Sequence, residues 1–165
     1  MKEKIIVVDD EDNILGSEFR EKVDEKKLRY RVSSLWITNS DNKILLARRA
    51  YTKKHSPGKW GPAVAGTVEE GESYEQNIRK EADEELGLKD IKIKKGTKIK
   101  FDGEHKRFTQ FFTSVLDKDA ENFKIQESEV AEVRWFEKEK IEEKMKKNPE
   151  EFISSMAEIV KIFLG

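Results

Sequence analysis

The sequence predicts a single domain of the mixed α/β (α+β) class. Short strand-like runs precede and follow one central amphipathic helix, and apolar residues recur at helical spacing near the end of the chain. Nine Phe, three Trp and three Tyr supply bulky side chains for a core, although charged residues reach 41%. Because no internal repeat or low-complexity linker divides the chain, residues 1–165 are expected to form one unit.

Strands are predicted before the central helix. Residues 4–8 are a β-branched run, and an Asp-rich turn and a charged stretch follow it, so residues 1–28 should add an N-terminal strand or hairpin to the main sheet. Residues 31–38 and 43–48 predict a hairpin around a turn. The Gly-, Pro- and cation-containing residues 49–61 predict a loop of defined shape.

Residues 73–86 predict the clearest helix. Ser73 followed by Gln76 is a capping-box pattern, and Gly87 suits a left-handed helix end. An apolar residue recurs every four positions, at Tyr74, Ile78, Ala82 and Leu86. The signals for the start, the buried face and the end of this helix therefore agree with one another.

The second half predicts further strands and then helices. Strands are expected over 91–101, 107–116 and 130–136. Residues 137–165 should be helical, and Pro149 suits the first turn of a helix with the stripe Phe152, Met156, Ile159 and Phe163. Lysines alternate with Ile from residue 91, which favours an exposed sheet edge over a phosphate- or RNA-binding patch.

Composition excludes several classes of protein. The 33 Lys and Arg nearly balance the 34 Asp and Glu, so general polyanion binding is disfavoured and no nucleic-acid partner is expected. There is no Cys, hence no disulfide framework and no thiolate chemistry. Without a membrane-length apolar run or a signal-peptide pattern, we expect a cytoplasmic protein with no membrane partner. Catalysis would have to use carboxylates, amines, hydroxyls or a hard metal ion.

Three carboxylates on the central helix point to such a metal ion. Glu81, Glu84 and Glu85 are spaced i, i+3 and i+4, which places them within an arc of about 100°. Their mutual repulsion is costly unless cations occupy the site, and magnesium prefers a few carboxylate ligands together with substrate phosphates. A solvated acidic helix face is the alternative interpretation.

The segment around these carboxylates resembles the Nudix box, G-x5-E-x7-R-E-U-x-E-E-x-G-U, where U is a bulky aliphatic residue. Residues 66–88 supply its fixed positions in register: Gly66, Glu72, Glu81, Glu84, Glu85, Gly87 and Leu88. Ala82 is a small substitute for U. Lys80 stands where the family has Arg, so charge is kept while bidentate geometry is lost.

The resemblance implies a Nudix fold, an α/β/α sandwich around a mixed sheet, and hydrolysis of a small-molecule diphosphate with Mg²⁺ or Mn²⁺. On that analogy Glu84 and Glu85 are metal ligands, Glu81 is a ligand or base, and the Gly66 carbonyl is a further ligand. Such cations neutralise diphosphate oxygens and activate a water molecule whose proton a carboxylate takes. Glu72 and Lys80 would organise the surrounding shell.

Residues 45–60 resemble isopentenyl-diphosphate isomerase and its hydrolase-like relatives. Arg49 and Lys53 match cations that hold the substrate diphosphate in the isomerase. However, Ala65 and Thr67 replace the Cys and His that the isomerase has on either side of the box glycine. Hydrolysis is therefore predicted, with isopentenyl-diphosphate isomerisation and a non-catalytic nucleotide- or RNA-binding module as alternatives. Because family members are often dimers, a homodimer is also considered.

A further carboxylate is expected from the segment that leads into the last strand. Glu127 and Glu129 are the candidates for a general base or an additional metal ligand. The alternative is an ordinary charged surface loop.

Overall fold

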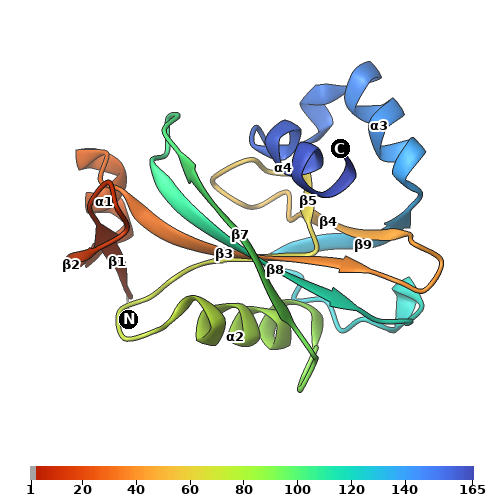
Figure 1. Ribbon diagram of the computed structural model, residues 1–165, viewed down its shortest axis with the longest axis horizontal. Helices are drawn as coiled ribbons and strands as arrows, with labels where there is room; N and C mark the ends of the chain where they lie inside the picture. The colour runs from red at the N-terminus through yellow and green to blue at the C-terminus, as the bar shows by residue number, and fades with distance from the viewer. Residues whose placement is uncertain (1–2) are drawn as a thin grey trace.

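The computed structural model describes residues 3–165, and these residues form a curled, nine-stranded mixed sheet between helices (Figure 1). Before the central helix lie β1 (Lys4–Val8), β2 (Ile14–Phe19), α1 (Arg20–Lys26), β3 (Tyr30–Thr38), β4 (Ile44–Arg49), β5 (Trp60–Pro62) and β6 (Val64–Thr67). The central helix α2 (Tyr74–Leu86) is followed by β7 (Lys94–Phe101), β8 (Arg107–Val115), β9 (Val130–Phe136), α3 (Lys138–Lys147) and α4 (Met156–Leu164). Short 3-10 helices cover Ala120–Asn122 and Pro149–Glu151.

The sheet divides into two arms that diverge from one hairpin. β3 and β4 pair only near the turn, at Ile37↔Leu45 and Thr38↔Ile44. Beyond this point β3 pairs with β6 and, in parallel, with β8, whereas β4 pairs with β5 and β9. The chain crosses from one arm to the other between β5 and β6. A cleft therefore opens between the arms.

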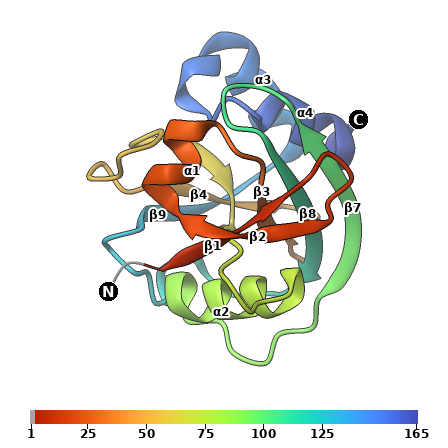
Figure 2. The same ribbon diagram turned by 90° about the vertical axis from the view of Figure 1, so that its left-hand side faces the viewer.

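Alternation along the strands divides the core into two layers. Leu35 and Ile37 of β3 pack with α2, while the intervening Trp36 packs on the opposite face with α3 and α4. Figures 1 and 2 show α2 below the sheet and α3 and α4 above it. The predicted α/β/α layering is confirmed. The prediction that residues 1–165 form a single domain stays a prediction.

The N-terminal hairpin is joined to the sheet through a buried carboxylate. β1 and β2 pair antiparallel, as predicted, and β1 touches β3 at Val7↔Tyr30. In the turn between them, Asp12 lies 2.8 Å from the Arg31 guanidinium and 2.7 Å from the Lys98 ammonium. The Tyr74 hydroxyl of α2 also donates to Asp12 (2.9 Å). One side chain thus connects the hairpin, two strands and the central helix.

Some predicted boundaries were wrong. β7 begins at Lys94 rather than at residue 91, and β5 and β6 lie in a segment with no predicted strand. Pro149 opens a 3-10 turn instead of the last helix. The reason is that Phe152 is buried beside Trp60, and the Ile153 amide donates to the Trp60 carbonyl (2.9 Å). These contacts hold the chain extended, so α4 starts only at Met156.

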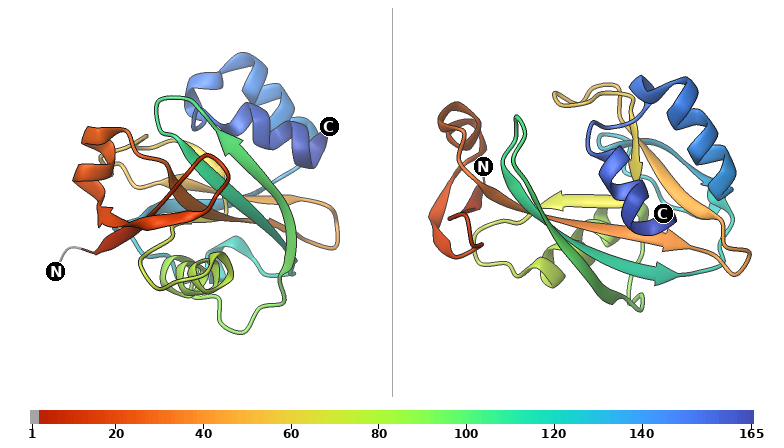
Figure 3. Two further views of the ribbon diagram at one scale, coloured as in Figure 1. Left: turned by 60° about the vertical axis from the view of Figure 1, so that its left-hand side comes forward. Right: turned by 45° about the horizontal axis from the view of Figure 1, so that its top comes forward.

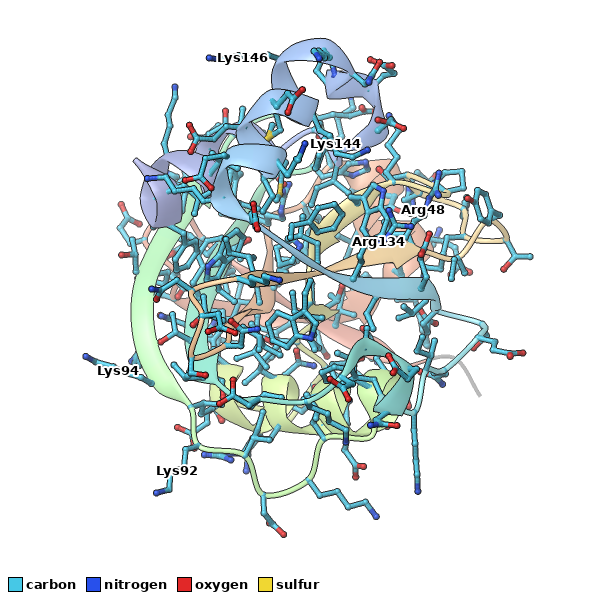
Figure 4. The ribbon with its side chains drawn as sticks, turned by 90° about the vertical axis from the view of Figure 1, so that its right-hand side faces the viewer. Arg48, Lys92, Lys94, Arg134, Lys144 and Lys146 are labelled. Carbon is cyan, nitrogen blue, oxygen red and sulfur yellow. The ribbon has the colours of Figure 1, made fainter. Side chains whose placement is uncertain are left out.

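The basic stretch that begins at residue 91 lies at the edge of the sheet. In the described part of the chain β7 pairs with β8 alone, and Lys92 and Lys94 extend into solvent (Figure 4). The predicted edge strand is confirmed. Among residues 3–165, none of the helices has the length and apolar character needed to cross a membrane.

Candidate functional site

Helix α2 is fixed at both ends, which sets the direction of its carboxylates. The Ser73 hydroxyl accepts from the Gln76 amide (3.1 Å), and the Gln76 side chain accepts from the Ser73 amide (2.9 Å). Gly87 adopts the left-handed conformation (φ 68°) at the other end. The predicted capping box and C-terminal glycine are confirmed.

The three glutamates of α2 share a face but differ in environment. Glu84 is exposed at the rim of a cavity, Glu81 is half-buried, and Glu85 has only 8% of its surface exposed. Burial, a hydrogen bond with Glu81 and the Glu81 charge raise the pKa of Glu85 to about 10. Burial also raises the pKa of Glu81. The pair therefore shares a proton when no cation is present.

Gly66 lets the carboxylates approach the sheet. A Cβ atom at this position would lie 2.4 Å from Cγ of Glu81 and 3.0 Å from Oδ1 of Asn77. Only glycine leaves this space, so the Gly66 backbone lies directly against Glu81. The structure thus brings together Gly66 and the carboxylates that the sequence predicted.

Lys80 holds two acidic side chains of the loop before α2. Its ammonium lies 2.8 Å from Glu69, 2.7 Å from Glu72 and 4.0 Å from Glu81. Although burial opposes the shift, the hydrogen bonds that Lys80 donates to Glu69 and Glu72 raise the pKa of Lys80. Glu72 also accepts from the Glu69 amide (2.8 Å), which closes the loop on itself. Lys80 thus joins this loop to α2, and the organising role of Glu72 and Lys80 stays a prediction.

The second arm of the sheet supplies Arg49 and Lys53. Arg49, at the end of β4, donates to the His55 carbonyl (3.0 Å). Burial lowers the pKa of the Arg49 guanidinium, and the negative charges of Glu129 and Glu85 oppose that shift. Lys53 forms an ion pair with Glu129, which lines the same cavity. Of the two candidate bases, Glu129 therefore lies at the site, whereas Glu127 is exposed outside the cavity.

These groups surround a cavity of about 790 Å³ in the cleft between the arms. Its floor is the upper face of β6, β3 and β8, which contributes Ala65, Thr67, Tyr30, Val32, Ser34, Arg107, Thr109 and Phe111. Figure 3 (right) shows α1, the loop between β4 and β5, and the turn between β7 and β8 rising together on this side of the sheet. His55 joins them, 3.6 Å from Asp24 of α1 and with its ring 5.3 Å from that of His105.

The donor set suits a hard divalent cation. Within residues 3–165 no three His, Cys, Asp or Glu side chains already converge as a metal cage, and the Glu81–Glu85 pair is joined by a hydrogen bond instead. Carboxylate oxygens are the ligands that Mg²⁺ and Mn²⁺ prefer. A cation at this place would replace the shared proton and offset the repulsion that the two ionised carboxylates would otherwise have.

Several residues at the site were missed by sequence reasoning. Asn77 is fully buried, accepts from the Ser33 hydroxyl, and donates to the Thr67 carbonyl (3.0 Å) and to Glu72 (3.1 Å). An Asn beside the apolar stripe of a helix was the available signal. Arg20 and Arg107 gave no comparable signal, because α1 and β8 meet at the cavity only in the folded chain.

Comparisons with known proteins show which sequences and folds this chain resembles. A family profile described as the NUDIX domain matches residues 27–156. A Nudix hydrolase of Yersinia pestis is 30% identical over 139 residues, which are 84% of this chain and 75% of the relative. The isopentenyl-diphosphate Delta-isomerase of Serratia proteamaculans is 35% identical over 88 residues, 53% of this chain and 49% of the isomerase. The crystal structure of DR0079 from Deinococcus radiodurans shares the fold, with a TM-score of 0.86 and 21% identity over 99% of this chain and 100% of that one.

Proposed function

Because the chain belongs to the Nudix family of hydrolases, we propose that it cleaves a phosphoanhydride bond in a small-molecule diphosphate, such as a nucleoside diphosphate linked to another moiety. One observation carries this proposal. The hydrogen-bonded Glu81–Glu85 pair lines the same cavity as Arg49, at the end of β4, and Lys53, in the loop after β4. The cavity thereby combines carboxylates that can bind a metal ion with basic side chains that can bind a diphosphate.

The metal site of this proposal consists of Glu81, Glu84, Glu85 and the Gly66 carbonyl, and its ion is Mg²⁺ or Mn²⁺. When bound, such an ion supplies charge neutralisation at the diphosphate and lowers the pKa of a coordinated water molecule. The protein contributes rigidity: the helix cap and the close contact at Gly66 hold the carboxylates in place, and Lys80 joins the preceding loop to α2 through Glu72.

Arg49 and Lys53 would bind the diphosphate oxygens, and Lys53 would also control Glu129. Lys53 is paired with Glu129 in the structure. A diphosphate that binds Lys53 competes with this carboxylate and releases it. A released Glu129 can accept the proton of the attacking water.

Isomerisation of isopentenyl diphosphate has less support. The sequence has no Cys, and Ala65 presents only a methyl group to the cavity. The Thr67 hydroxyl accepts a hydrogen bond from Arg20 (3.0 Å), so it is already engaged. A pure binding module has no need for a pair of adjacent carboxyl groups whose simultaneous ionisation is costly.

A product-resolved hydrolysis screen tests the proposal. Nucleotide and isoprenoid diphosphates, isopentenyl diphosphate among them, are incubated with Mg²⁺ or Mn²⁺ and the wild-type, Glu85→Gln, Glu129→Gln or Glu127→Gln protein. Metal-dependent release of phosphate-containing fragments is expected, reduced roughly 100-fold or more by Glu85→Gln. Glu129→Gln should lower kcat with little change in KM, and exposed Glu127→Gln is the matched control. A shifted double bond, or binding without turnover, contradicts the proposal.

The cytoplasmic location and the homodimer stay predictions. Light scattering of the purified protein would test the dimer.

A further inference from the structure

Two hydroxyl groups in the cavity floor have no hydrogen-bond partner among the described residues. Ser34 on β3 is 2% exposed and Thr109 on β8 is 4% exposed, and both hydroxyl oxygens are buried. Strand alternation places both side chains on the cavity side, because neighbouring Ser33 bonds to Asn77 on the α2 side. A buried polar group without a partner is costly, so these hydroxyls are expected to meet a polar group that enters the cavity.

Two arginines border the same floor. Arg20 donates to the Thr67 hydroxyl (3.0 Å) and the Tyr30 hydroxyl (3.3 Å) and pairs with Asp24 (3.1 Å). Arg107 donates to the His105 carbonyl (3.0 Å) and stacks on the Phe101 ring (4.5 Å), contacts that leave its positive charge in place.

The positive charge of Arg20 acts on Arg107 across the cavity floor. Burial lowers the pKa of Arg107 and the charge of Arg20 lowers it further, while Tyr30 and Glu158 of α4 act in the opposite sense. Burial and the charge of Arg20 likewise lower the pKa of His55. An anion placed between Arg20 and Arg107 would relieve the repulsion between the two guanidinium groups.

We propose that the floor between Arg20 and Arg107, together with the Ser34 and Thr109 hydroxyls, is a second anion subsite. It would bind a phosphate or carboxylate on the part of the substrate that does not react. This inference rests on the proposed function and narrows its substrate class to diphosphates that carry an additional anionic group.

The position of the subsite ties it to the reacting centre. Arg20 binds Thr67, which directly follows Gly66, and Gly66 lies against Glu81. The carboxylates approach β6 from the α2 side, whereas Arg20, Ser34 and their neighbours lie on the other side. One small molecule can therefore place its diphosphate at the free edge of β6 and extend its remaining part over the floor.

Substrate pairs that differ by one anionic group test the subsite. Coenzyme A against dephospho-coenzyme A, and NADPH against NADH, vary a phosphate; UDP-glucuronic acid against UDP-glucose varies a carboxylate. For wild type we expect kcat/KM to be about 10-fold higher or more for the anionic member of at least one pair, mainly through KM. The pair that discriminates identifies the chemistry as phosphate or carboxylate.

Variants show which residues cause the preference for the anionic member of a pair. Arg107→Gln should reduce the ratio of the two kcat/KM values to about threefold or less while the neutral member is still cleaved. Arg107→Lys should restore part of this ratio. Arg134→Gln removes an exposed cation outside the cavity (Figure 4) and should leave the ratio of the two kcat/KM values unchanged. Ser34→Ala and Thr109→Val should keep Tm at or above the wild-type value, since they remove unsatisfied hydroxyls, yet raise KM for the anionic member.

The outcomes separate this inference from the proposed function. Hydrolysis without preference in any pair, or a preference that Arg107→Gln leaves intact, overturns the subsite while the hydrolase stands. If no compound is cleaved, calorimetry of the metal-free protein with the same pairs decides. Tighter binding of an anionic member that depends on Arg107 supports the subsite, and equal or absent binding of both members overturns it.

Discussion

Glu85→Gln is expected to make the metal-free protein more stable, although it lowers hydrolytic activity roughly 100-fold or more. The folded-state pKa of Glu85 is about 10, against an ordinary value of 4.5. Between these values the folded protein binds a proton that the unfolded chain has released, so this residue lowers stability as pH rises. Glutamine carries no such cost and can still donate a hydrogen bond to Glu81.

The magnitude follows from the linkage relation. Each pH unit above 4.5 costs about 1.4 kcal/mol, so the penalty at pH 7 is about 3 kcal/mol. For a chain of 165 residues this corresponds to a rise in Tm of about 6–12 °C. The two proteins should converge near pH 4, where Glu85 is protonated in both states.

Thermal melts in a chelating buffer from pH 4 to pH 8 measure this difference. Glu84→Gln is the matched control, because Glu84 is exposed on the same helix and its substitution should change stability by about 0.5 kcal/mol or less. Added Mg²⁺ should stabilise wild type more than Glu85→Gln. A Glu85→Gln protein no more stable than wild type at pH 7, or a stability gain independent of pH, would refute the reasoning.

Three further substitutions test the surrounding structure. Gly66→Ala places a Cβ 2.4 Å from Cγ of Glu81 and should destabilise the fold by about 1–3 kcal/mol in urea unfolding. Lys80→Arg should preserve or raise kcat in steady-state assays, because a guanidinium can bind both loop carboxylates, and a large loss would contradict this. Asp12→Asn should cost about 3 kcal/mol at pH 7 in urea unfolding, since Arg31 loses a buried partner. Although burial opposes the shift, hydrogen bonds lower the pKa of Asp12 below 3.8, so the cost should vanish as pH falls through that lowered pKa.

Local signals predicted the parts of the fold and site that depend on neighbouring residues. The cap at Ser73, the apolar stripe of α2 and the end at Gly87 act within a few residues, and the structure agrees with each. Because helix spacing fixes the relative positions of Glu81 and Glu85, their proximity could also be read from the sequence.

Contacts between distant segments account for what could not be predicted. Pro149 is a sound helix-start signal, but burial of Phe152 beside Trp60 overrides it. Arg20 and Arg107 are far apart in the sequence and meet at the cavity because Arg20 of α1 donates to the Tyr30 hydroxyl of β3, and Tyr30 lies opposite Arg107 in the parallel β3–β8 pair. Neither residue has a sequence neighbour that distinguishes it from other surface cations.

Side chains alternate along β6, so the proposed metal site and the proposed substrate-binding floor lie on opposite faces of this strand. Gly66 faces α2 and lies against Glu81, whereas Ala65 and Thr67 face the cavity above β3. A larger side chain at position 66 must therefore displace Glu81, a proposed metal ligand. Changes at positions 65 and 67 alter the space available to the rest of the substrate and leave the carboxylates in place. Substrate choice in this chain can thus vary through residues on the cavity side without any change to the chemistry on the helix side.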